Sequence, residues 1–328
     1  MYNKNSREKR NAWLLSVYLR DYSFRLFWWS FMDGAARRIG AHKTYVHTSR
    51  KRRQVCQNYL RKNYSDIINK WKYKRDCEEN YIGIDSPVWI FWWQGKRQCP
   101  YPVDLCVQSV ERRSGRHPVH FVSQENIDDY IDIPKYIRKK FDSGNILPAH
   151  FADYIRMCLL YKYGGIWIDA AFMLTRPIPE SISDYKFFSI NHGGKRDWVA
   201  SSDKWSIGLL GSGKNYTLMG FCKEMFEAYW EKENVEIAYL FSDYIIALGY
   251  EEIEEIHQDV DALPENNKDC FFFIENGNKE CDSAKLKRIL SENWLAQLTY
   301  KVKWEKVKDG KETYFGVLLK ALESVEYK

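Results

Sequence analysis

The sequence predicts an α/β fold in which a mostly parallel, Rossmann-type sheet is flanked by helices. Strand-like and helix-like segments alternate from about residue 85 to residue 190, as in doubly wound folds. Residues 1–80 contain no proline and read as helical and basic. The 328 residues can bury a full α/β core. We therefore predict a helical N-terminal region, 1–80, and a second domain, 81–328.

The individual elements follow from local patterns. Residues 88–93 form a continuous apolar run rich in β-branched and aromatic side chains, which predicts a buried first strand. Ser123 is a candidate cap for the helix after the second strand. Residues 251–282 are acidic and rich in Asn and Gly, and we expect a surface excursion there. The other expected elements are helices at 100–113, 149–163, 218–230 and 240–248, and strands at 118–122, 166–168 and 186–190.

Residues 149–171 carry the most information about function. Apolar residues recur at helical spacing from Phe151 to Leu159, whereas Asp153 and Arg156, three apart, share a different helix face. Gly164-Gly165 predicts the end of the helix with an αL cap, and a short buried strand ends at Asp169. Ligands bind beyond the carboxyl ends of strands in open α/β sheets. An Asp, an Arg and a second Asp are thus predicted at one edge of the sheet.

The order Asp-x-x-Arg, then Tyr-Gly-Gly-x-Trp-x-Asp, resembles the core of the DXD-type glycosyltransferases with a GT-A fold. The resemblance is greatest to the capsular polysaccharide synthesis proteins, which are related to the yeast-type α-mannosyltransferases and the large glucosylating toxins. It continues through residues 88–95, 204–205 and 241–246, and covers roughly residues 85–300. The resemblance implies a GT-A-like fold and a transferase, most simply a hexosyltransferase.

The resemblance also implies roles for the acidic segment. Asp153 and Arg156 would hold hydroxyls of the donor sugar, and Asp169 would begin the DXD motif. The structural alternative for Asp153 and Arg156 is an exposed ion pair of a few tenths of a kcal/mol. The second motif acid is replaced by Ala171. We therefore expect the site to bind Mn²⁺ or Mg²⁺ weakly. The expected protein ligands are Asp169 and Asn293, and substrate phosphates would supply the others.

Further residues are assigned to the nucleotide-sugar site. Trp92 corresponds to the uracil-stacking Trp of the family, and the turn after it would allow the backbone to approach the nucleotide at Gly95. Each residue also has a structural interpretation: core packing for the tryptophans, a helix start for His150, and a structural hydrogen bond for Asp243. The expected set is Trp92, Trp93, Gln94, Gly95, His150, Gly165, Lys204 and Asp243.

The expected reaction is transfer of a sugar from a nucleotide donor, most simply a UDP-sugar, to a lipid-linked or polysaccharide acceptor. The resemblance implies retention of the anomeric configuration. The alternative is a non-catalytic nucleotide-sugar or glycan-binding protein, because Ala171 replaces a usual ligand. Sugar-phosphate transfer is a further alternative without a supporting motif.

Charge is distributed unevenly along the chain. Residues 1–80 contain 19 Lys and Arg against 7 Asp and Glu, whereas the remainder contains 31 against 37. The basic region includes residues 50–53 and an aromatic stretch at 24–32. This composition suits peripheral contact with an anionic membrane, and equally suits packing on the second domain. Nucleic-acid binding is not expected, because no known module matches.

Targeting signals are the remaining constraint. No signal peptide is visible, and the longest apolar runs, 13–19 and 26–32, fall far short of the ~20 residues of a membrane-spanning helix. The eight cysteines show no zinc spacing, so we expect reduced thiols. The expected location is cytoplasmic, either in solution or at the inner face of the plasma membrane.

Overall fold

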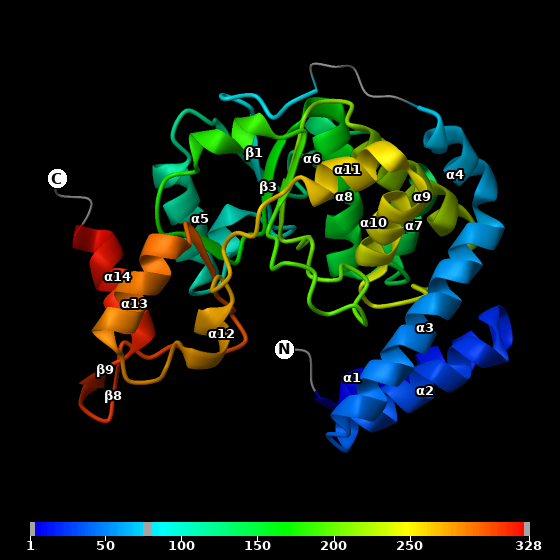
Figure 1. Cartoon of the computed structure of the whole chain (residues 1–328), viewed down its shortest axis with the longest axis horizontal. Coiled ribbons are helices and arrows are strands. Elements are labelled where there is room, and N and C mark those ends of the chain that lie inside the picture. The colour runs from blue at the N-terminus through cyan, green and yellow to red at the C-terminus, as the bar shows by residue number, and fades with distance from the viewer. Residues whose placement is uncertain (1–3, 75–79, 325–328) are drawn as a thin grey trace.

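A five-stranded sheet forms the centre of the protein (Figure 1). The structure is a computed structural model that describes residues 4–74 and 80–324. The strand order is β2-β1-β3-β6-β5. The strands are β1 (Val88–Phe91), β2 (Val119–Val122), β3 (Gly165–Ile168), β5 (Phe187–Ser189) and β6 (Leu209–Ser212).

Four of these strands point the same way and β6 runs against them. β1 pairs in parallel with β2 and β3, whereas β6 pairs antiparallel with β3 and β5. Every residue of β1, β3 and β6 is buried, as expected of strands covered on both faces. The predicted mixed α/β class with a mostly parallel sheet is confirmed. Sequence analysis did not predict β6, because its four residues, two of them Gly and Ser, carry no alternating pattern.

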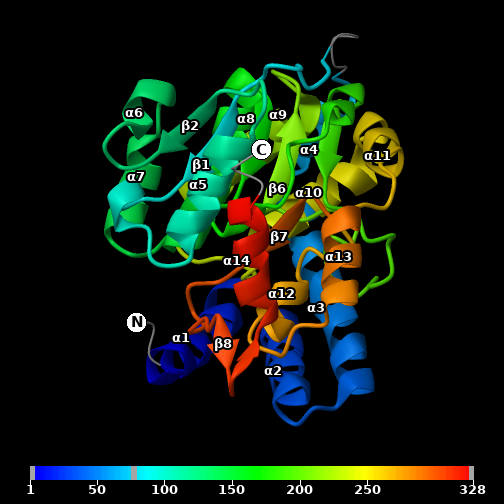
Figure 2. The ribbon, with the colours of Figure 1, turned by 90° about the vertical axis from the view of Figure 1, so that its left-hand side faces the viewer.

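Helices cover both faces of the sheet. α5 lies on one side, and α8, α9 and α10 lie on the other (Figures 1 and 2). These helices and the short ones near the sheet are α5 (Val103–Arg113), α6 (Ile127–Tyr130), α7 (Lys135–Asp142), α8 (Pro148–Tyr163), α9 (Thr217–Lys232), α10 (Phe241–Glu252) and α11 (Glu254–Asp261), with single turns η2 (Lys96–Gln98) and η3 (Glu180–Asp184).

The C-terminal part adds a smaller unit next to α5. β4 pairs antiparallel with β7, so the segment after β3 is tied to a strand more than a hundred residues later. A separate hydrophobic cluster includes buried residues of α13 and α14. The elements are β4 (Phe172–Leu174), α12 (Phe272–Asn276), α13 (Ser283–Glu292), β7 (Leu295–Gln297), the hairpin β8 (Val307–Lys308) and β9 (Lys311–Glu312), and α14 (Tyr314–Ser324).

Three local predictions need correction. Residues 251–282 are not a surface excursion: they contain α11 and α12, and Ile256, Val260 and Phe273 are buried. The polar Asn and Gly residues mark the turns between these short amphipathic helices. The first strand ends at Phe91, before the turn that contains Trp92 and Trp93. The segment after β2 forms one four-residue helix whose N-cap is Asn126, not Ser123.

The N-terminal region is helical, as predicted, and part of it belongs to the main core. Buried side chains of α3 and α4, such as Leu60, lie in the same hydrophobic cluster as the sheet. Trp71 donates to Glu224 over 2.7 Å and packs where a Cβ on Gly220 of α9 would clash with it. The four helices and one π-helical turn are α1 (Lys4–Val17), η1 (Tyr18–Tyr22), α2 (Phe24–Arg38), α3 (His42–Asn63) and α4 (Ser65–Lys72).

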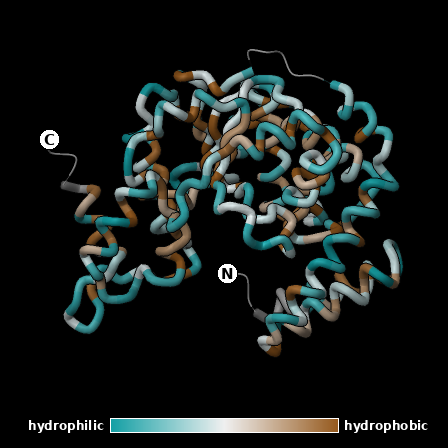
Figure 3. Tube along the Cα trace, in the orientation of Figure 1, coloured by the Kyte–Doolittle hydropathy of each residue, from teal (hydrophilic) through white to brown (hydrophobic). Residues whose placement is uncertain are grey.

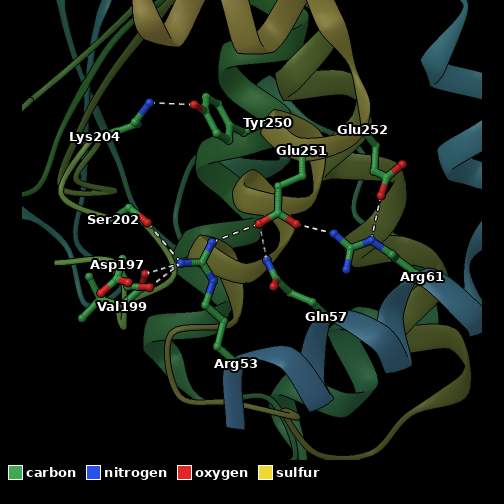
Figure 4. Close-up of polar contacts among 10 residues, drawn as sticks. All are labelled: Arg53, Gln57, Arg61, Asp197, Val199, Ser202, Lys204, Tyr250, Glu251 and Glu252. Carbon is green, nitrogen blue, oxygen red and sulfur yellow. Dashed lines mark hydrogen bonds and ion pairs between the residues drawn. The ribbon is translucent and has the colours of Figure 1, made fainter. Parts of the chain in front are cut away.

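Ion pairs join basic α3 to the acidic end of α10 (Figure 4). Glu251 accepts from Arg53 over 3.0 Å and from Gln57 over 2.9 Å, and also pairs with Arg61. Arg61 reaches Glu252 over 2.7 Å. Part of the basic excess of residues 1–80 therefore pairs with the acidic second domain. The boundary between the two domains stays a prediction.

The cysteines and the helix lengths can be stated for the described ranges. The seven cysteines in the described ranges are all free, and Cys77 lies outside those ranges. Within residues 4–74 and 80–324, no helix combines the length and the apolar character needed to cross a membrane.

Two consecutive glycines turn the chain from α8 into β3. Gly164 has φ 69° and ψ −162°, a conformation that is essentially restricted to glycine, instead of the αL cap predicted from sequence. Gly165 has φ 101°, and a Cβ there would lie 2.1 Å from the Pro87 carbonyl oxygen. That carbonyl accepts from the backbone N–H of Ile166 over 2.8 Å. The close approach of β3 to the preceding loop therefore requires glycine.

We predict that Gly165→Ala lowers the free energy of unfolding by about 3 kcal/mol or more, because it adds a clash to an unfavourable φ. Gly115 is the matched control: its φ is 67°, but a Cβ there would meet no atom within 4 Å. Gly115→Ala should cost only about 1 kcal/mol. Urea unfolding of both variants provides the measurement, and equal losses would contradict the packing argument.

Candidate active site

Asp169 lies directly after β3, at the carboxyl end of a strand in the parallel part of the sheet. Its backbone N–H donates to the Gly208 carbonyl over 2.8 Å. Its Oδ1 accepts from the Arg156 Nη2 over 2.8 Å and from the Trp167 Nε1 over 2.7 Å. The side chain is 34% exposed. One carboxylate oxygen is thus fixed by two donors, while part of the group faces solvent.

Arg156 connects Asp169 to the interior. Its side chain is 3% exposed and its Nη1 donates to Asp153 Oδ1 over 2.6 Å. The guanidinium carbon lies 4.7 Å from the centre of the Trp167 ring. Burial alone would lower the pKa of Arg156, but Asp169 and Asp153 outweigh burial and raise that pKa. Asp153 and Arg156 therefore form a buried ion pair, not the exposed surface pair that was the structural alternative.

A serine and an acid of α10, Ser242 and Asp243, complete the cluster. The Ser242 hydroxyl donates to the remaining oxygen of Asp153. Asp243 is buried and accepts from the Trp205 indole N–H over 2.9 Å. Burial raises the pKa of Asp243 to about 7; the Trp205 hydrogen bond opposes this rise, Asp153 adds to it and Arg156 opposes it. Asp243 thus titrates near neutrality beside the ionic cluster.

The predicted nucleotide-binding turn follows β1. Trp92 is half-buried and meets Tyr300 edge to face, with ring centres 5.7 Å apart. Trp93 packs instead edge to face against the stacked rings of Phe141 and Phe151, so it lies partly buried against the core. The backbone N–H of Gly95 donates to the Trp92 carbonyl over 3.0 Å, and Gly95 has φ 93°. Gln94 is exposed at this turn.

The other predicted site residues lie in different surroundings. His150 is buried at the start of α8, where its Nε2 lies 2.8 Å from the Tyr239 carbonyl oxygen and its Nδ1 has no partner. Lys204 points to Tyr250 (Figure 4), with 2.6 Å between their polar atoms, and pairs with Asp261. The structure therefore does not bring Lys204 into contact with Asp169. Gly165 serves the packing described above.

The side chain of Asn293 is engaged in hydrogen bonds to the backbone. It is buried, and its side-chain oxygen accepts from the Asp269 backbone N–H over 2.9 Å. Its side-chain nitrogen donates to the Ile289 carbonyl over 2.7 Å. Both polar atoms are thus committed to the backbone. In the described ranges, no group of three or more His, Cys, Asp or Glu residues is arranged to hold a metal ion.

Four residues of the cluster were not singled out from sequence. Trp167 and Trp205 each donate an indole N–H to an acid, and Ser242 donates its hydroxyl to Asp153. A Cβ at Gly208 would lie 3.2 Å from Asp169 Oδ2, so this glycine leaves room beside the carboxylate. Three of the four, Trp167, Trp205 and Ser242, lie in the segments that carry the family resemblance, and this was the sequence signal that could have identified them.

Together, the sheet and the Asp-Arg-Asp cluster define an α/β protein with its candidate site at the carboxyl edge of β3. The model of the capsular polysaccharide synthesis protein family matches residues 37–318, and the chain belongs to this family.

Curated relatives carry the same class of name. The chain is 32% identical over 108 residues to the O-glycosyltransferase braB of Annulohypoxylon truncatum, a match that covers 30% of this chain and 26% of the relative. It is 22% identical over 169 residues to the glycosyltransferase afumC of Aspergillus fumigatus, covering 44% of this chain and 40% of that protein. The chain thus spans well under half the length of these relatives.

A solved structure named PaToxG glycosyltransferase is a more distant neighbour. It is 15% identical, with a TM-score of 0.36, and the alignment covers 81% of this chain and 98% of that one. This likeness is too weak to add to the fold assignment.

We predict that Asp243 makes stability depend on pH. The folded state keeps this proton up to about pH 7, whereas the unfolded carboxyl, with its usual pKa of 3.8, loses it earlier. Between these values the unfolded state binds fewer protons, so the contribution of Asp243 to the free energy of unfolding falls as pH rises, by up to about 1.4 kcal/mol per unit. Asp243→Asn, which keeps an oxygen for Trp205, should remove this loss.

Urea unfolding at pH 5 and pH 8 measures the effect. The stability of Asp243→Asn relative to the wild type should increase from the lower to the higher pH. A stability difference that is the same at both pH values would contradict the titration of Asp243 in this range.

Proposed function

We propose that the protein is a sugar-nucleotide-dependent glycosyltransferase that moves a hexosyl group from a UDP-sugar to a capsular or cell-surface polysaccharide acceptor, with retention of configuration. The observation that carries the proposal is Asp169. It is a partly exposed carboxylate after a buried parallel strand, and hydrogen bonds from Arg156 and Trp167 orient it. Family membership and the names of the relatives support the same class.

Asp169 suits a sugar nucleotide chemically. The donor presents sugar and ribose hydroxyls, which a carboxylate oxygen can accept, and a diphosphate. Because Arg156 uses two nitrogens on Asp153 and Asp169, its first task is to position Asp169. A positioned charge of this kind stabilises a transition state without reorganisation during the reaction. Half-exposed Trp92 is the aromatic surface for the base, and Tyr300 supports its ring from the C-terminal unit.

Retention is proposed to follow a same-face course. A covalent intermediate would require a carboxylate free to attack the anomeric carbon. Asp153 and Asp243 are buried and hydrogen-bonded to Ser242 and Trp205. The departing diphosphate is then the group that assists the incoming acceptor, and the protein contributes positioning and electrostatics.

The side chains at the site offer few ligands for a divalent cation, so binding of the cation would be weak. Oδ1 of Asp169 already accepts two hydrogen bonds, which leaves Oδ2 for a cation. Ala171 supplies no second oxygen from its side chain, and both polar atoms of the Asn293 side chain are engaged. Mn²⁺ or Mg²⁺ would thus be held by one carboxylate oxygen, water and the donor diphosphate, and would neutralise the diphosphate charge.

One observation favours a second function. With Ala171 in place of the second acid, the site can bind a nucleotide sugar or a glycan without turning it over. The alternative is therefore a binding protein with a degenerate site, and nucleotide release distinguishes the two.

We predict that the purified chain releases UDP from at least one of a panel of UDP-sugars, slowly with water and faster with a polysaccharide acceptor. Asp169→Asn should lower this rate by about 10²-fold or more, because it removes the charge and keeps the shape. Exposed Asp66 of α4 gives the matched control, and Asp66→Asn should retain the wild-type rate. UDP release by a coupled assay is the measurement.

The same assay tests the weak cation site and the alternative function. A chelator should slow release without abolishing it, and added Mn²⁺ should restore the rate. Nucleotide binding without release from any donor would overturn the transferase and support the binding protein. Equal rates for Asp169→Asn and the wild type would contradict the assigned site.

A further inference from the structure

An aromatic ladder runs along the outer side of α2. Phe24, Phe27, Trp28 and Phe31 follow helical spacing, and successive ring centres lie 6.1–6.5 Å apart. Phe24 is 63% exposed, Trp28 43% and Phe31 47%, whereas Phe27 is partly buried and packs against the main core. We call these four residues the aromatic face. Contiguous exposed rings of this size mark an interaction surface, because single scattered apolar residues are what soluble surfaces usually show.

Two further exposed apolar side chains lie on the elements that precede α2. Trp13 of α1 is 48% exposed and Leu19 of η1 is 49% exposed. Figure 3 shows hydrophobic positions along this N-terminal pair of helices, between hydrophilic ones. The opposite side of α2 is in contrast committed to the protein, where Leu26 is buried in the main core.

Among the described side chains of α1, η1, α2 and the first part of α3, most exposed charges are positive. Asp21 is paired with Arg20, and Asp33 is buried and paired with Arg37 and Arg52. Beside them, further exposed cations are present: Lys9, Arg25, Lys43 and Lys51. Aromatic side chains flanked by Arg and Lys are the composition of a helix that lies in the interface of an anionic bilayer.

A second exposed element lies at the same end of the molecule. In both Figure 1 and Figure 2 the β8–β9 hairpin and the α1–α2 pair lie at the lower end. Val307 at the hairpin is 55% exposed, and exposed Lys306 and Lys308 lie beside it. Lys311 pairs with Glu280 over 2.8 Å, and Asp309 and Glu312 are exposed acids of the same hairpin. Two separated elements with apolar tips and cations at one end suit a broad surface better than a compact partner.

The α1–α2 pair is also tied to the candidate site through one loop. Arg10 pairs with buried Glu236 over 2.9 Å, and the Tyr18 hydroxyl donates to the Glu236 carbonyl over 3.2 Å. The loop then exposes Tyr239 and Leu240, which are 62% and 44% exposed. Ser242, two residues further, donates to Asp153. The seven residues from Glu236 to Ser242 therefore connect the N-terminal helices to the Asp-Arg-Asp cluster.

We propose that this end of the molecule binds the surface of an anionic lipid bilayer, with the aromatic face of α2 inserted at the headgroup level and the surrounding cations against the lipid charge. Tyr239 and Leu240 then lie on the side of the candidate site nearest the α1–α2 pair. Bilayer binding does not depend on the proposed transfer reaction, because it requires only these helices and lipid.

Co-sedimentation with vesicles tests the proposal without any sugar nucleotide. The full chain should bind phosphatidylglycerol-containing vesicles at low salt, and much less to pure phosphatidylcholine or at high salt. The triple variant Phe24→Ser, Trp28→Ser, Phe31→Ser should lower the partition coefficient about tenfold or more. Arg25→Glu should lower it at low salt and have a smaller effect at high salt.

Matched controls remove exposed apolar or basic side chains elsewhere. Tyr73, Tyr81 and Ile84 are 78%, 50% and 45% exposed and lie outside α1–α2. Their triple replacement by Ser, and Lys287→Glu on α13, should leave binding unchanged. Circular dichroism confirms that each variant is folded. Wild-type chain that stays in the supernatant at low salt, or equal losses for the aromatic-face and control triples, would overturn the proposal.

Discussion

The buried guanidinium of Arg156 is the constraint on which the rest of the candidate site depends. An arginine that is 3% exposed is tolerated only if nearby acids offset the loss of hydration. Asp153, three residues earlier on the same helix, supplies one acid, and Asp169 at the end of β3 supplies the other. Removing one partner of such a buried cluster costs about 3–5 kcal/mol in other proteins. The interaction therefore fixes how α8 and β3 meet.

This constraint also explains why Asp169 is available for chemistry. Because Arg156 and Trp167 both donate to Oδ1, the carboxylate has a fixed orientation while part of it stays exposed. Gly208 keeps space beside it, and Gly165 lets β3 approach the preceding loop. The helices of the N-terminal region support the same site from outside, since α10 carries both Asp243 of the cluster and Glu251, which pairs with Arg53 of α3.

The class of fold and the acidic segment could be predicted from sequence because both are encoded locally. Asp153, Arg156 and Asp169 lie within seventeen residues, where helical spacing and a glycine stop determine their positions. Asp243 of α10 was expected from the resemblance, but the contact of Ser242 with Asp153 could not be predicted, since these two residues lie 89 positions apart in the chain. Composition also could not decide between membrane contact and packing on the second domain for residues 1–80. The structure separates them along the chain: cations of α3 pair with the acidic domain, whereas the aromatic face of α2 is exposed.

The most direct test of this account is a double-mutant cycle on Arg156 and Asp169. Urea unfolding of the wild type, Arg156→Gln, Asp169→Asn and the double variant gives the coupling free energy between the two side chains. We expect a favourable coupling of about 1–3 kcal/mol, so that Asp169→Asn costs much less once Arg156 is gone. Additive losses would contradict the claim that Arg156 holds Asp169 in place.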